Sequence, residues 1–591
     1  MSTDRSTPSA PVPDRLHGTD ERDRLDALDP SPVRSRRRGV RPLAALAVPA
    51  VALALAGCSA VTPATSGSGS TAGGTGAAGG GAAQAADTFG EPAQDGQVKQ
   101  GGDLVMALSA EPDQLDPALS RSLYSRYVFH TMCQKLYDVD EKAQIVPQLA
   151  TALPTTSDDG LTVTVPVREG AKFADGTAFD AAAVKASLER ELTLEASARK
   201  SELGPIDKVE APDAKTVVIT LSKPFAPLTA ALTDRAGMIV SPTQAKKLGD
   251  DFASAPVCVG PFKFSKRVPQ NSIEVVKDPN YYDAAKVHLD KITYRIITDS
   301  SIRSANLRSG DVQVADSLSA QDVPALQGED ALTVLQSQSL GYQGLTINLG
   351  NVDGVGTPPK PIDRPEAKNA MVRQALELSI DRPGLVKVIF NDLNTVACSP
   401  ISPTTEFTSE AAQTCAPHDP AKAKQMLQDA GVSTPVKIEM ITSNNPDSLR
   451  LAQALQAMVK EGGFDLQIKP VEYATLLDQQ DRGDFSVLQL GWSGRIDPDA
   501  NITNFLRTGG SQNVSGYSST ALDDLLDQAR EEQDPAQRRE LYGKAVAQIQ
   551  KDEPIIYLYR QRNLTGVSNT VKGVQVFPDG VIRVAFAGLA S

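Results

Sequence analysis

Residues 419–492 alternate between helix-like and strand-like segments, an order that few folds accommodate. The helix-like "HDPAKAKQMLQDAG" has Asp419 as its cap, Pro420 at its first position and Gly431 as its stop. The strand-like "VKIEMIT", "LQIKPVEY" and "FSVLQLGW" follow, separated by helix-like segments such as "SLRLAQALQAMVKEGG". This order predicts an α/β lobe with largely parallel strands. Ligands of such sheets bind beyond the carboxyl ends of the strands.

The composition narrows the class of protein. The chain has 591 residues, of which 40% are hydrophobic and 22% charged, and its net charge is -13. These values are typical of a folded protein with several domains. We expect no nucleic acid partner, because an acidic surface repels phosphate and no cluster of Lys and Arg follows the N-terminal region.

A basic and then apolar segment near the N-terminus, "SPVRSRRRGVRPLAALAVPAVALALAGCSA", has the order of an export signal. Its apolar run, Leu43 to Ala56, is shorter than the roughly 20 residues of a membrane-spanning helix. The run ends in Leu-Ala-Gly-Cys, which resembles the lipobox of bacterial lipoproteins. We therefore predict that residues 1–57 are an N-terminal extension and signal peptide, and that Cys58 carries acyl chains such as palmitate. A buried cysteine that ends an apolar helix is the alternative, and Sec and twin-arginine export both stay open.

Residues 58–100 consist mainly of small residues and cannot bury enough apolar surface to fold. We predict a flexible tether with a typical span of roughly 35 Å. The folded part would then lie at the outer face of the cytoplasmic membrane, held by the lipid.

Four further cysteines follow the tether, and in an oxidising compartment an even number favours disulfides. Three pairings are possible. Cys398 with Cys415 is the local choice, which leaves Cys133 with Cys258. Four reduced, buried thiols are the alternative. Metal ligation is disfavoured because there is no C-x-x-C spacing and the few histidines are scattered.

Secreted hydrolases are a rival class, but the chain has no G-x-S-x-G, H-E-x-x-H or P-loop pattern. We therefore predict a protein that is not an enzyme and needs neither a cofactor nor a metal. A surface sensor or adhesin would share the lipobox and the tether, so it stays an alternative.

Several phrases, in order, resemble one family over almost all of residues 101–590. They include "EPDQLDPAL", "QKLYD", "PVCVGPFKF", "LRSGDVQVAD", "NAMVRQALELSIDR", "DPAKAKQMLQDAG" and "GWSGRIDPD". The family is that of the extracellular solute-binding proteins of ABC importers, family 5, the peptide, opine and nickel class. The resemblance implies an α/β type II periplasmic-binding-protein fold, in which two lobes close over a solute by a hinge.

The resemblance also implies an extra domain inserted in lobe I. The expected boundaries are 101–141, 255–345 and 560–591 for lobe I, 142–254 for the inserted domain and 346–559 for lobe II. On this map each expected cysteine pair falls within one lobe. The hinge is expected at 341–348 and 555–562, where the chain crosses between the lobes.

The segment "GWSGRIDPDAN" corresponds to a cleft wall in peptide-binding members, where an aspartate holds the α-ammonium of the peptide. Arg495 takes that place here, and a guanidinium suits a carboxylate or phosphate instead. The family's carboxylate-binding arginine has no counterpart in "TSNNPDS", since no base precedes Arg450. We expect an anionic group of the ligand to meet Arg495 while a planar part stacks on Trp492.

Weaker candidates complete the expected site: Asp497, Tyr473, Ser122 and Tyr124. Three of them have an alternative role. Asp497 suits a turn before Pro498, Ser122 suits a helix cap, and Tyr473 suits a core. Trp492 could be a packing residue. Arg495 could be a latch between the lobes, or form a salt bridge with Asp497 or Asp499.

The resemblance implies a monomer that captures a peptide-like or other small anionic solute and delivers it to permease and ATPase subunits. Relatives hold sugars, nickel chelates or opines in the same frame, so an oligosaccharide or opine ligand is an alternative. Nickel is disfavoured because histidines are few.

Overall fold

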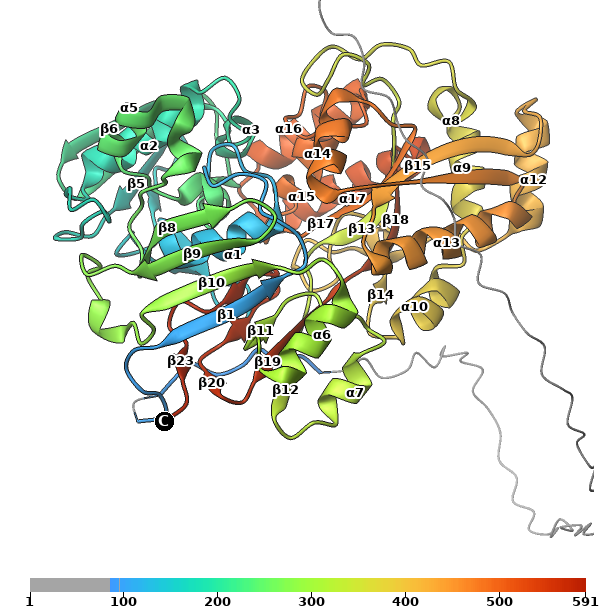
Figure 1. Ribbon diagram of the computed structural model, residues 1–591. Coiled ribbons are helices and arrows are strands. Elements are labelled where there is room, and N and C mark those ends of the chain that lie inside the picture. Colours follow the sequence, from blue (N-terminus) through green and yellow to red (C-terminus); the bar gives the residue numbers. More distant parts are fainter. Residues whose placement is uncertain (1–85, 95) are drawn as a thin grey trace, which may run out of the picture. The chain divides into compact units, whose positions relative to one another are not determined.

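Three larger β-sheets organise the residues that this computed structural model describes, 86–94 and 96–591 (Figure 1). The predicted signal peptide and Cys58 lie outside the described residues. The first sheet has seven strands in the order β12-β19-β11-β1-β10-β9-β8. These strands are β1 (Asp103–Leu108), β8 (Phe262–Val268), β9 (Ser272–Lys277), β10 (Lys291–Ile296), β11 (Val314–Ala315), β12 (Leu332–Gln338) and β19 (Arg562–Ser568). Helix α1 (Leu123–Met132) packs against β8, and α6 (Ser300–Ser309) packs against β11 and β19.

The second sheet has six strands in the order β14-β18-β13-β17-β15-β16. They are β13 (Tyr342–Ile347), β14 (Thr395–Val396), β15 (Val436–Ser443), β16 (Phe464–Val471), β17 (Val487–Trp492) and β18 (Ile555–Arg560). The predicted strand and helix alternation is confirmed, with helices α12 (Pro420–Asp429), α13 (Pro446–Glu461) and α14 (Tyr473–Arg482). The predicted parallel pairing is correct only for β15 with β16 and β17, because β13 runs antiparallel to β17 and β18.

A third sheet of four strands, in the order β4-β5-β7-β6, lies within the segment expected as an inserted domain. Its strands are β4 (Thr155–Thr156), β5 (Thr162–Pro166), β6 (Ile206–Asp213) and β7 (Thr216–Leu221). Helix α2 (Ala181–Thr193) begins after its cap Asp180 and packs on β6 and β7. This sheet and helix share one apolar core, which includes Val165, Leu188 and Ile219.

The chain crosses between the two large sheets twice. It leaves β12 at Gln338 and enters β13 at Tyr342, and only Gln561 separates β18 from β19. The expected lobe boundary after residue 345 therefore falls inside β13, and the first crossing lies a few residues earlier than expected. The cause is that β13 pairs along its whole length with β17 of the second sheet.

Residues 86–94 and 96–100 differ from the expected flexible tether. Thr88 forms a β-bridge with Gln336, and the ring of Phe89 meets that of Phe577 edge-on at 6.2 Å. Asp87 also forms an ion pair with Arg562 at 2.9 Å. This stretch contains enough apolar and polar anchors to dock on the edge of β12.

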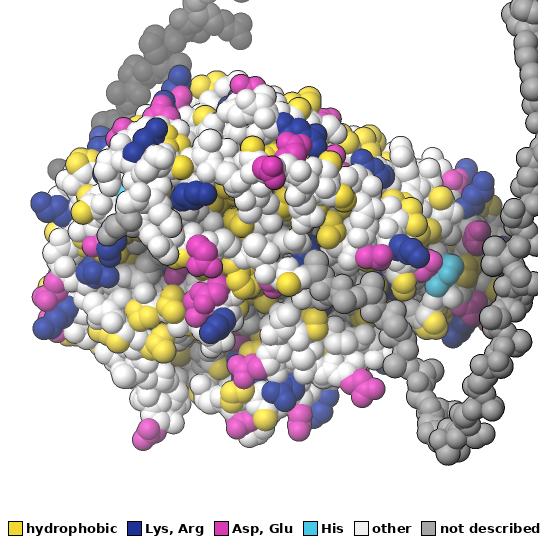
Figure 2. Space-filling view, turned by 90° about the horizontal axis from the view of Figure 1, so that it is seen from below, with side chains coloured by type: hydrophobic (Ala, Val, Ile, Leu, Met, Phe, Trp, Pro, Cys, Tyr) yellow, Lys and Arg dark blue, Asp and Glu magenta, His cyan; other side chains and the backbone are white. Residues whose placement is uncertain are grey.

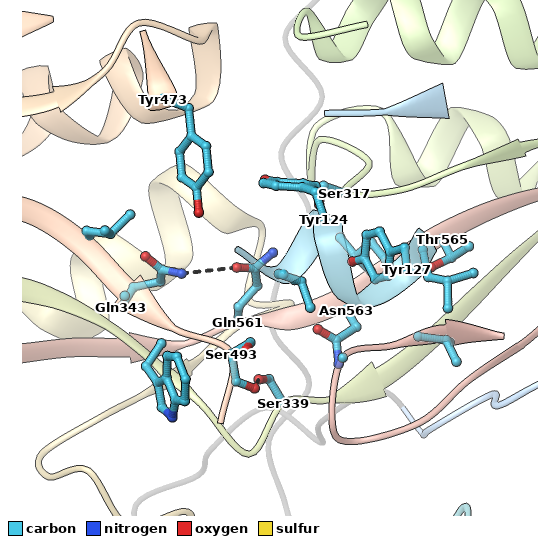
Figure 3. A pocket seen from close by; sticks show the side chains of 18 of the residues that line it. Tyr124, Tyr127, Ser317, Ser339, Gln343, Tyr473, Ser493, Gln561, Asn563 and Thr565 are labelled. Carbon is cyan, nitrogen blue, oxygen red and sulfur yellow. Dashed lines mark hydrogen bonds between the residues drawn. The ribbon is translucent and has the colours of Figure 1, made fainter. Parts of the chain in front are cut away.

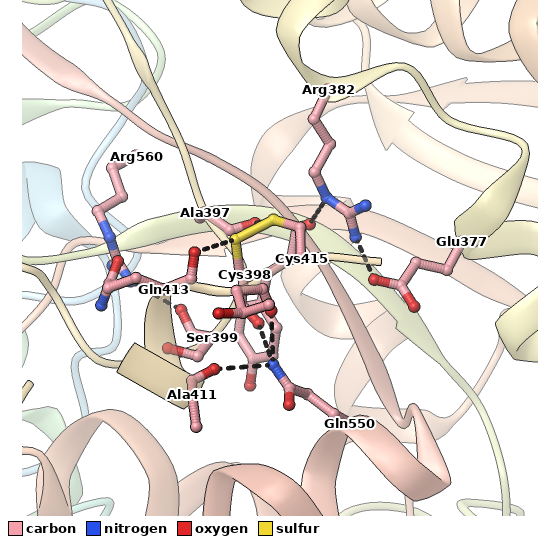
Figure 4. Close-up of a disulfide and its surroundings, with 12 residues drawn as sticks. Glu377, Arg382, Ala397, Cys398, Ser399, Ala411, Gln413, Cys415, Gln550 and Arg560 are labelled. Atoms are coloured by element: carbon pink, nitrogen blue, oxygen red, sulfur yellow. Dashed lines mark hydrogen bonds and ion pairs between the residues drawn. A yellow bond between two sulfur atoms is a disulfide. The ribbon is translucent and has the colours of Figure 1, made fainter. Parts of the chain in front are cut away.

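Both predicted disulfides, Cys133–Cys258 and Cys398–Cys415, are confirmed. The loop that the second one closes is fastened to the end of β18 and to the helix α17 (Pro535–Asp552) (Figure 4). Arg560 donates to the carbonyl oxygen of Ser399 at 2.8 Å and to that of Gly341 at 2.9 Å. The loop is thereby attached to the first crossing between the sheets.

On the face shown in Figure 2, basic and acidic side chains are interspersed and do not gather into a basic field. Among the helices of the described part, none has the length and apolar character required to span a membrane.

Candidate functional site

The carboxyl ends of the three parallel strands meet at one cavity between the two large sheets. Ser443 ends β15, Tyr473 follows β16 and Trp492 ends β17, and all three residues line the cavity. The parallel pairing of β15 with its two neighbours brings these ends to the same edge. This is the position at which α/β sheets bind ligands.

The cavity has two chambers, which we name after one residue in each. The Trp492 chamber measures about 140 Å³ and the Arg450 chamber about 200 Å³. Both are lined by Tyr124 from the first lobe and Tyr473 from the second, whose rings meet edge-on at 5.4 Å. Burial raises the pKa of Tyr124 to about 12 and that of Tyr473 further, so both hydroxyls stay protonated and can donate hydrogen bonds.

Amides and hydroxyls dominate the polar lining of the Trp492 chamber (Figure 3). Gln343 on β13 donates from Nε2 to Oε1 of Gln561 at 3.3 Å. Tyr473 points its hydroxyl towards this amide pair (Figure 3). The two glutamines lie at the crossings between the sheets, so the chamber is built partly from the connecting strands.

The Arg450 chamber is the charged one. Three arginines, Arg303, Arg450 and Arg562, and one aspartate, Asp447, line it. Arg303 donates to backbone carbonyl groups and lies 3.7 Å from a carboxylate oxygen of Asp316, while Arg562 pairs with Asp87. Arg450 is the most exposed of the three, with 41% of its side chain accessible.

Arg450 lies in the second turn of α13, whose N-terminus faces the chamber through Asn445 and Ser448. Its Nη1 is 3.0 Å from Oδ1 of Asp447. Among the described residues, Asp447 is its only hydrogen-bond partner, so Nε and Nη2 can donate to a ligand. A guanidinium at a helix N-terminus is suited to a carboxylate.

Trp492 lies in the cavity wall, as expected for a residue at the end of a strand. Its indole Nε1 donates to Oδ1 of Asn501 at 2.9 Å, and its ring meets that of Phe505 edge-on at 4.9 Å. The guanidinium of Arg495 stacks on it, 4.3 Å from the ring centroid. These contacts with Asn501, Phe505 and Arg495 fix the indole in place.

The guanidinium of Arg495, expected as the anchor for an anionic group, does not line either chamber of the cavity in this structure. Its Nη2 lies 2.5 Å from Oδ2 of Asp234, and only 8% of its side chain is exposed. The space beside it measures about 20 Å³, which is enough for little more than a water molecule. Burial and the neighbouring Arg126 lower the pKa of Arg495 to about 9. The sequence context of Arg495 allowed a latch between the lobes. Its partner here, Asp234, lies in the segment expected as the inserted domain.

Two other expected ligand contacts serve the fold. Both carboxylate oxygens of Asp497 accept hydrogen bonds from Arg538 at 2.9 Å, so Asp497 cannot take an amine. The hydroxyl of Ser122 accepts from the backbone N–H of Tyr124 at 3.0 Å and caps α1. Of the expected residues, the structure brings Trp492, Tyr473 and Tyr124 to the cavity.

Arg450, Gln343 and Gln561 are among the cavity residues that the sequence did not reveal. Arg450 follows a strand end, as a ligand anchor should, but it lies within the helix and not in the preceding loop. The glutamines carry no motif. Both glutamines fall within the hinge segments that the resemblance implied, 341–348 and 555–562, and this is the signal that could have identified them.

The fold and the cavity define a class of protein: two α/β lobes, joined by two crossings, that enclose a small-molecule site. The model of the bacterial extracellular solute-binding proteins, family 5, matches residues 144–513. The chain belongs to this family, and the predicted type II periplasmic-binding-protein fold is confirmed. Members are non-enzymatic binding proteins, and this chain is the solute-binding component of an ABC importer.

Individual relatives are similar to this protein over most of its chain. The glutathione-binding protein GsiB of Escherichia coli (strain K12) is 29% identical over 491 residues, which are 81% of this chain and 92% of GsiB. AgaA from A. tumefacien R10, solved with agropinic acid, has a TM-score of 0.73 at 27% identity and covers 82% of this chain and 96% of its own. DppA from Helicobacter pylori, solved with the peptide STSA, has a TM-score of 0.75 at 27% identity, with coverages of 83% and 99%.

Proposed function

We propose that this protein captures a small peptide-like or related anionic solute in the two chambers and delivers it to an ABC permease. The observation that carries the proposal is the Arg450 guanidinium, which is half-exposed within the cavity at the start of α13. A carboxylate there would accept two hydrogen bonds from Nε and Nη2 and would face the positive end of the helix dipole.

The solutes of the relatives support this class. GsiB is named for glutathione, AgaA was solved with agropinic acid and DppA with a peptide. All three of these solutes are small polar molecules, and two of them are peptides or peptide-like. A cavity of two chambers that together measure a few hundred Å³ suits a ligand of that size.

We further propose that Cys58 is lipidated and holds the protein at the outer face of the cytoplasmic membrane. The basic flank, the short apolar run and the Leu-Ala-Gly-Cys end carry this step. Two acyl chains at about 0.8 kcal/mol per buried methylene would anchor the protein stably. Mass spectrometry of the protein extracted from membranes should show the N-terminal cysteine with its lipid, and Cys58→Ala should release the protein into the medium.

Native mass spectrometry of protein purified without refolding tests the solute. We expect a co-purified molecule that carries a carboxylate. Arg450→Ala should then weaken its binding about tenfold to a hundredfold, because a charge-assisted hydrogen-bond pair is lost. Arg482→Ala is the matched control, since Arg482 lies at the far end of α14 and its side chain is 60% exposed. Equal affinity of the Arg450 variant and the control would contradict the proposed anchor.

A further inference from the structure

The Trp492 chamber differs from the Arg450 chamber in charge. Among the described residues that line it, only Arg121 is charged, and its Nη1 lies 2.5 Å from Oδ2 of Asp481. The Arg121–Asp481 ion pair spans the two lobes and neutralises that guanidinium. A charged group of a solute that entered this chamber would therefore lose its hydration and would find no ionic partner in exchange.

The chamber instead presents amide groups that both donate and accept. In the Gln343–Gln561 pair, one N–H and one carbonyl oxygen satisfy each other, which leaves the Gln343 oxygen and the Gln561 amide nitrogen for a solute. Asn563 donates from Nδ2 to Ser337 and keeps its Oδ1 for an incoming donor. The polar lining thus offers both hydrogen-bond acceptors and hydrogen-bond donors at short range.

Aromatic rings form the rest of the wall. Trp492, Tyr124 and Tyr127 line the chamber, and the indole is fixed by Asn501 on one edge and by Arg495 on one face. A flat, partly apolar group can lie against such rings while its polar edge meets the amides.

We infer that the part of the solute held in the Trp492 chamber is an uncharged group that both donates and accepts hydrogen bonds, and that charged groups are excluded from it. This inference rests on the proposed function and adds the chemical class of the second end of the solute. The solute would then have an anionic end at Arg450 and a neutral polar end at the glutamine pair. A carboxamide side chain of a peptide and the hydroxyl groups of a sugar share this chemistry.

Calorimetry with matched solutes tests the inference. The peptide arm is a tripeptide of alanine in which each position in turn is replaced by Gln or by its charged isostere Glu. The sugar arm compares a disaccharide in which one residue is a uronic acid and the other is neutral with the corresponding disaccharide of two uronic acids; these are its neutral and charged forms. At one peptide position, or in the sugar pair, we expect the neutral form to bind about tenfold more tightly or better, because the charged form loses its hydration without gaining a partner. The arm that shows the preference identifies the source of the neutral group.

Variants connect the preference to the chamber. Gln561→Ala and Gln343→Ala should each reduce the discrimination between neutral and charged solutes to about twofold or less, while Gln425→Ala on the exposed face of α12 should keep it. Circular dichroism identifies any variant that has not folded. If one glutamine variant does not fold, the discrimination measured with the other one tests the inference.

Two outcomes would overturn the inference in different ways. If Glu binds as tightly as Gln at every position and the disaccharide of two uronic acids binds as tightly as the one with a single uronic acid, the chamber does not select against charge, although the proposed function stands. If the folded protein binds none of these solutes, the proposed function fails and the inference fails with it.

Discussion

His130 is a buried histidine in a strongly charged part of the molecule. It lies on α1, its Nε2 is 3.8 Å from a carboxylate oxygen of Asp138, and Lys135 and Arg583 also lie near it. Burial and the nearby Arg583 lower the pKa of His130 to about 3, against the smaller opposing effect of Asp138. The folded protein therefore keeps this imidazole neutral at pH values where the unfolded chain protonates it.

This difference predicts a loss of stability in mild acid. A base whose folded pKa is depressed contributes stability that is complete above its unfolded pKa, about 6.5, and is lost as the pH falls towards the folded value. Between pH 7 and pH 5, His130 should account for about 2 kcal/mol of the loss. His130→Gln, measured by urea unfolding at both pH values, should lose less stability than the parent protein by that amount. An equal loss in both proteins would mean that His130 is charged or exposed in the folded state.

At the scale of single residues, the sequence predicts what depends on local pattern and fails where the partner is distant. The cap Asp419 and the disulfide Cys398–Cys415 follow from short-range spacing. Arg495 could not be assigned in the same way, because Asp234 belongs to another domain and nothing near Arg495 indicates it. A basic residue in a cleft loop can be a ligand anchor or a latch between domains, and the sequence around it looks the same in both cases.

At the scale of elements, the loop after β17 is shaped by a close approach of two backbones. Gly494 has a φ of +83°, and a Cβ on it would lie 2.3 Å from the backbone nitrogen of Gly341 at the first crossing. A Cβ on Gly341 would in turn lie 1.8 Å from the carbonyl oxygen of Trp492. The cavity wall and the crossing are therefore in direct contact, and only glycine fits at either position.

Gly494→Ala should therefore destabilise the protein beyond the cost of its backbone conformation. Gly509 is the matched control, because its φ is +74° and a Cβ there would meet nothing within 4 Å. We expect Gly509→Ala to cost about 1 kcal/mol and Gly494→Ala about 3 kcal/mol, since the second also displaces the crossing. Urea unfolding of both variants measures the difference in their free energies of unfolding. Equal losses of stability would show that the crossing can move to accommodate the added methyl group at little cost.

The order of the elements could be predicted from the sequence, but part of the strand pairing could not. The order of strands and helices between residues 419 and 492 follows from their periodicity and caps. The antiparallel pairing of β13 and β18 does not, because these strands come from distant parts of the chain and their apolar runs fit either direction. The antiparallel strands β13 and β18 lead into the two crossings, and their side of the sheet contributes the two glutamines of the cavity.

At the scale of the whole molecule, alternating charges link the two lobes and the inserted domain. The ion pairs in this chain are Lys135–Asp138, Asp138–Arg583, Arg583–Asp579, Asp579–Arg126, Arg126–Asp234 and Asp234–Arg495, with N–O distances from 2.5 to 3.6 Å. Although burial opposes it, Arg126 and Arg495 lower the pKa of Asp234 well below its usual range, so this carboxylate stays ionised. Asp234 thus links Arg495 of the second lobe to the segment expected as the inserted domain, and it does not line either chamber of the cavity.

Such a contact should bias the equilibrium between open and closed lobes, and Arg495→Met tests this, because it removes the charge and keeps most of the stem. Asp234 keeps Arg126 as a partner, at 2.9 Å, so the variant should fold. Small-angle scattering without solute should give a larger radius of gyration than the parent protein, and solute affinity should fall severalfold because each binding event must now supply more of the closure energy. Arg507→Met is the control, since its partner Asp527 lies in the same lobe.

The choice of solutes separates a latch from a ligand anchor. A latch acts on closure, so Arg495→Met should weaken an anionic solute and a neutral analogue by the same factor, whereas Arg450→Ala should weaken the anionic solute alone. If Arg495→Met impaired only the anionic solute, its guanidinium would have to leave Asp234 and enter the cavity on binding. An unchanged radius together with unchanged affinities would instead show that the Asp234 contact contributes nothing to closure, and that the lobes are held by Arg121–Asp481 and their other contacts.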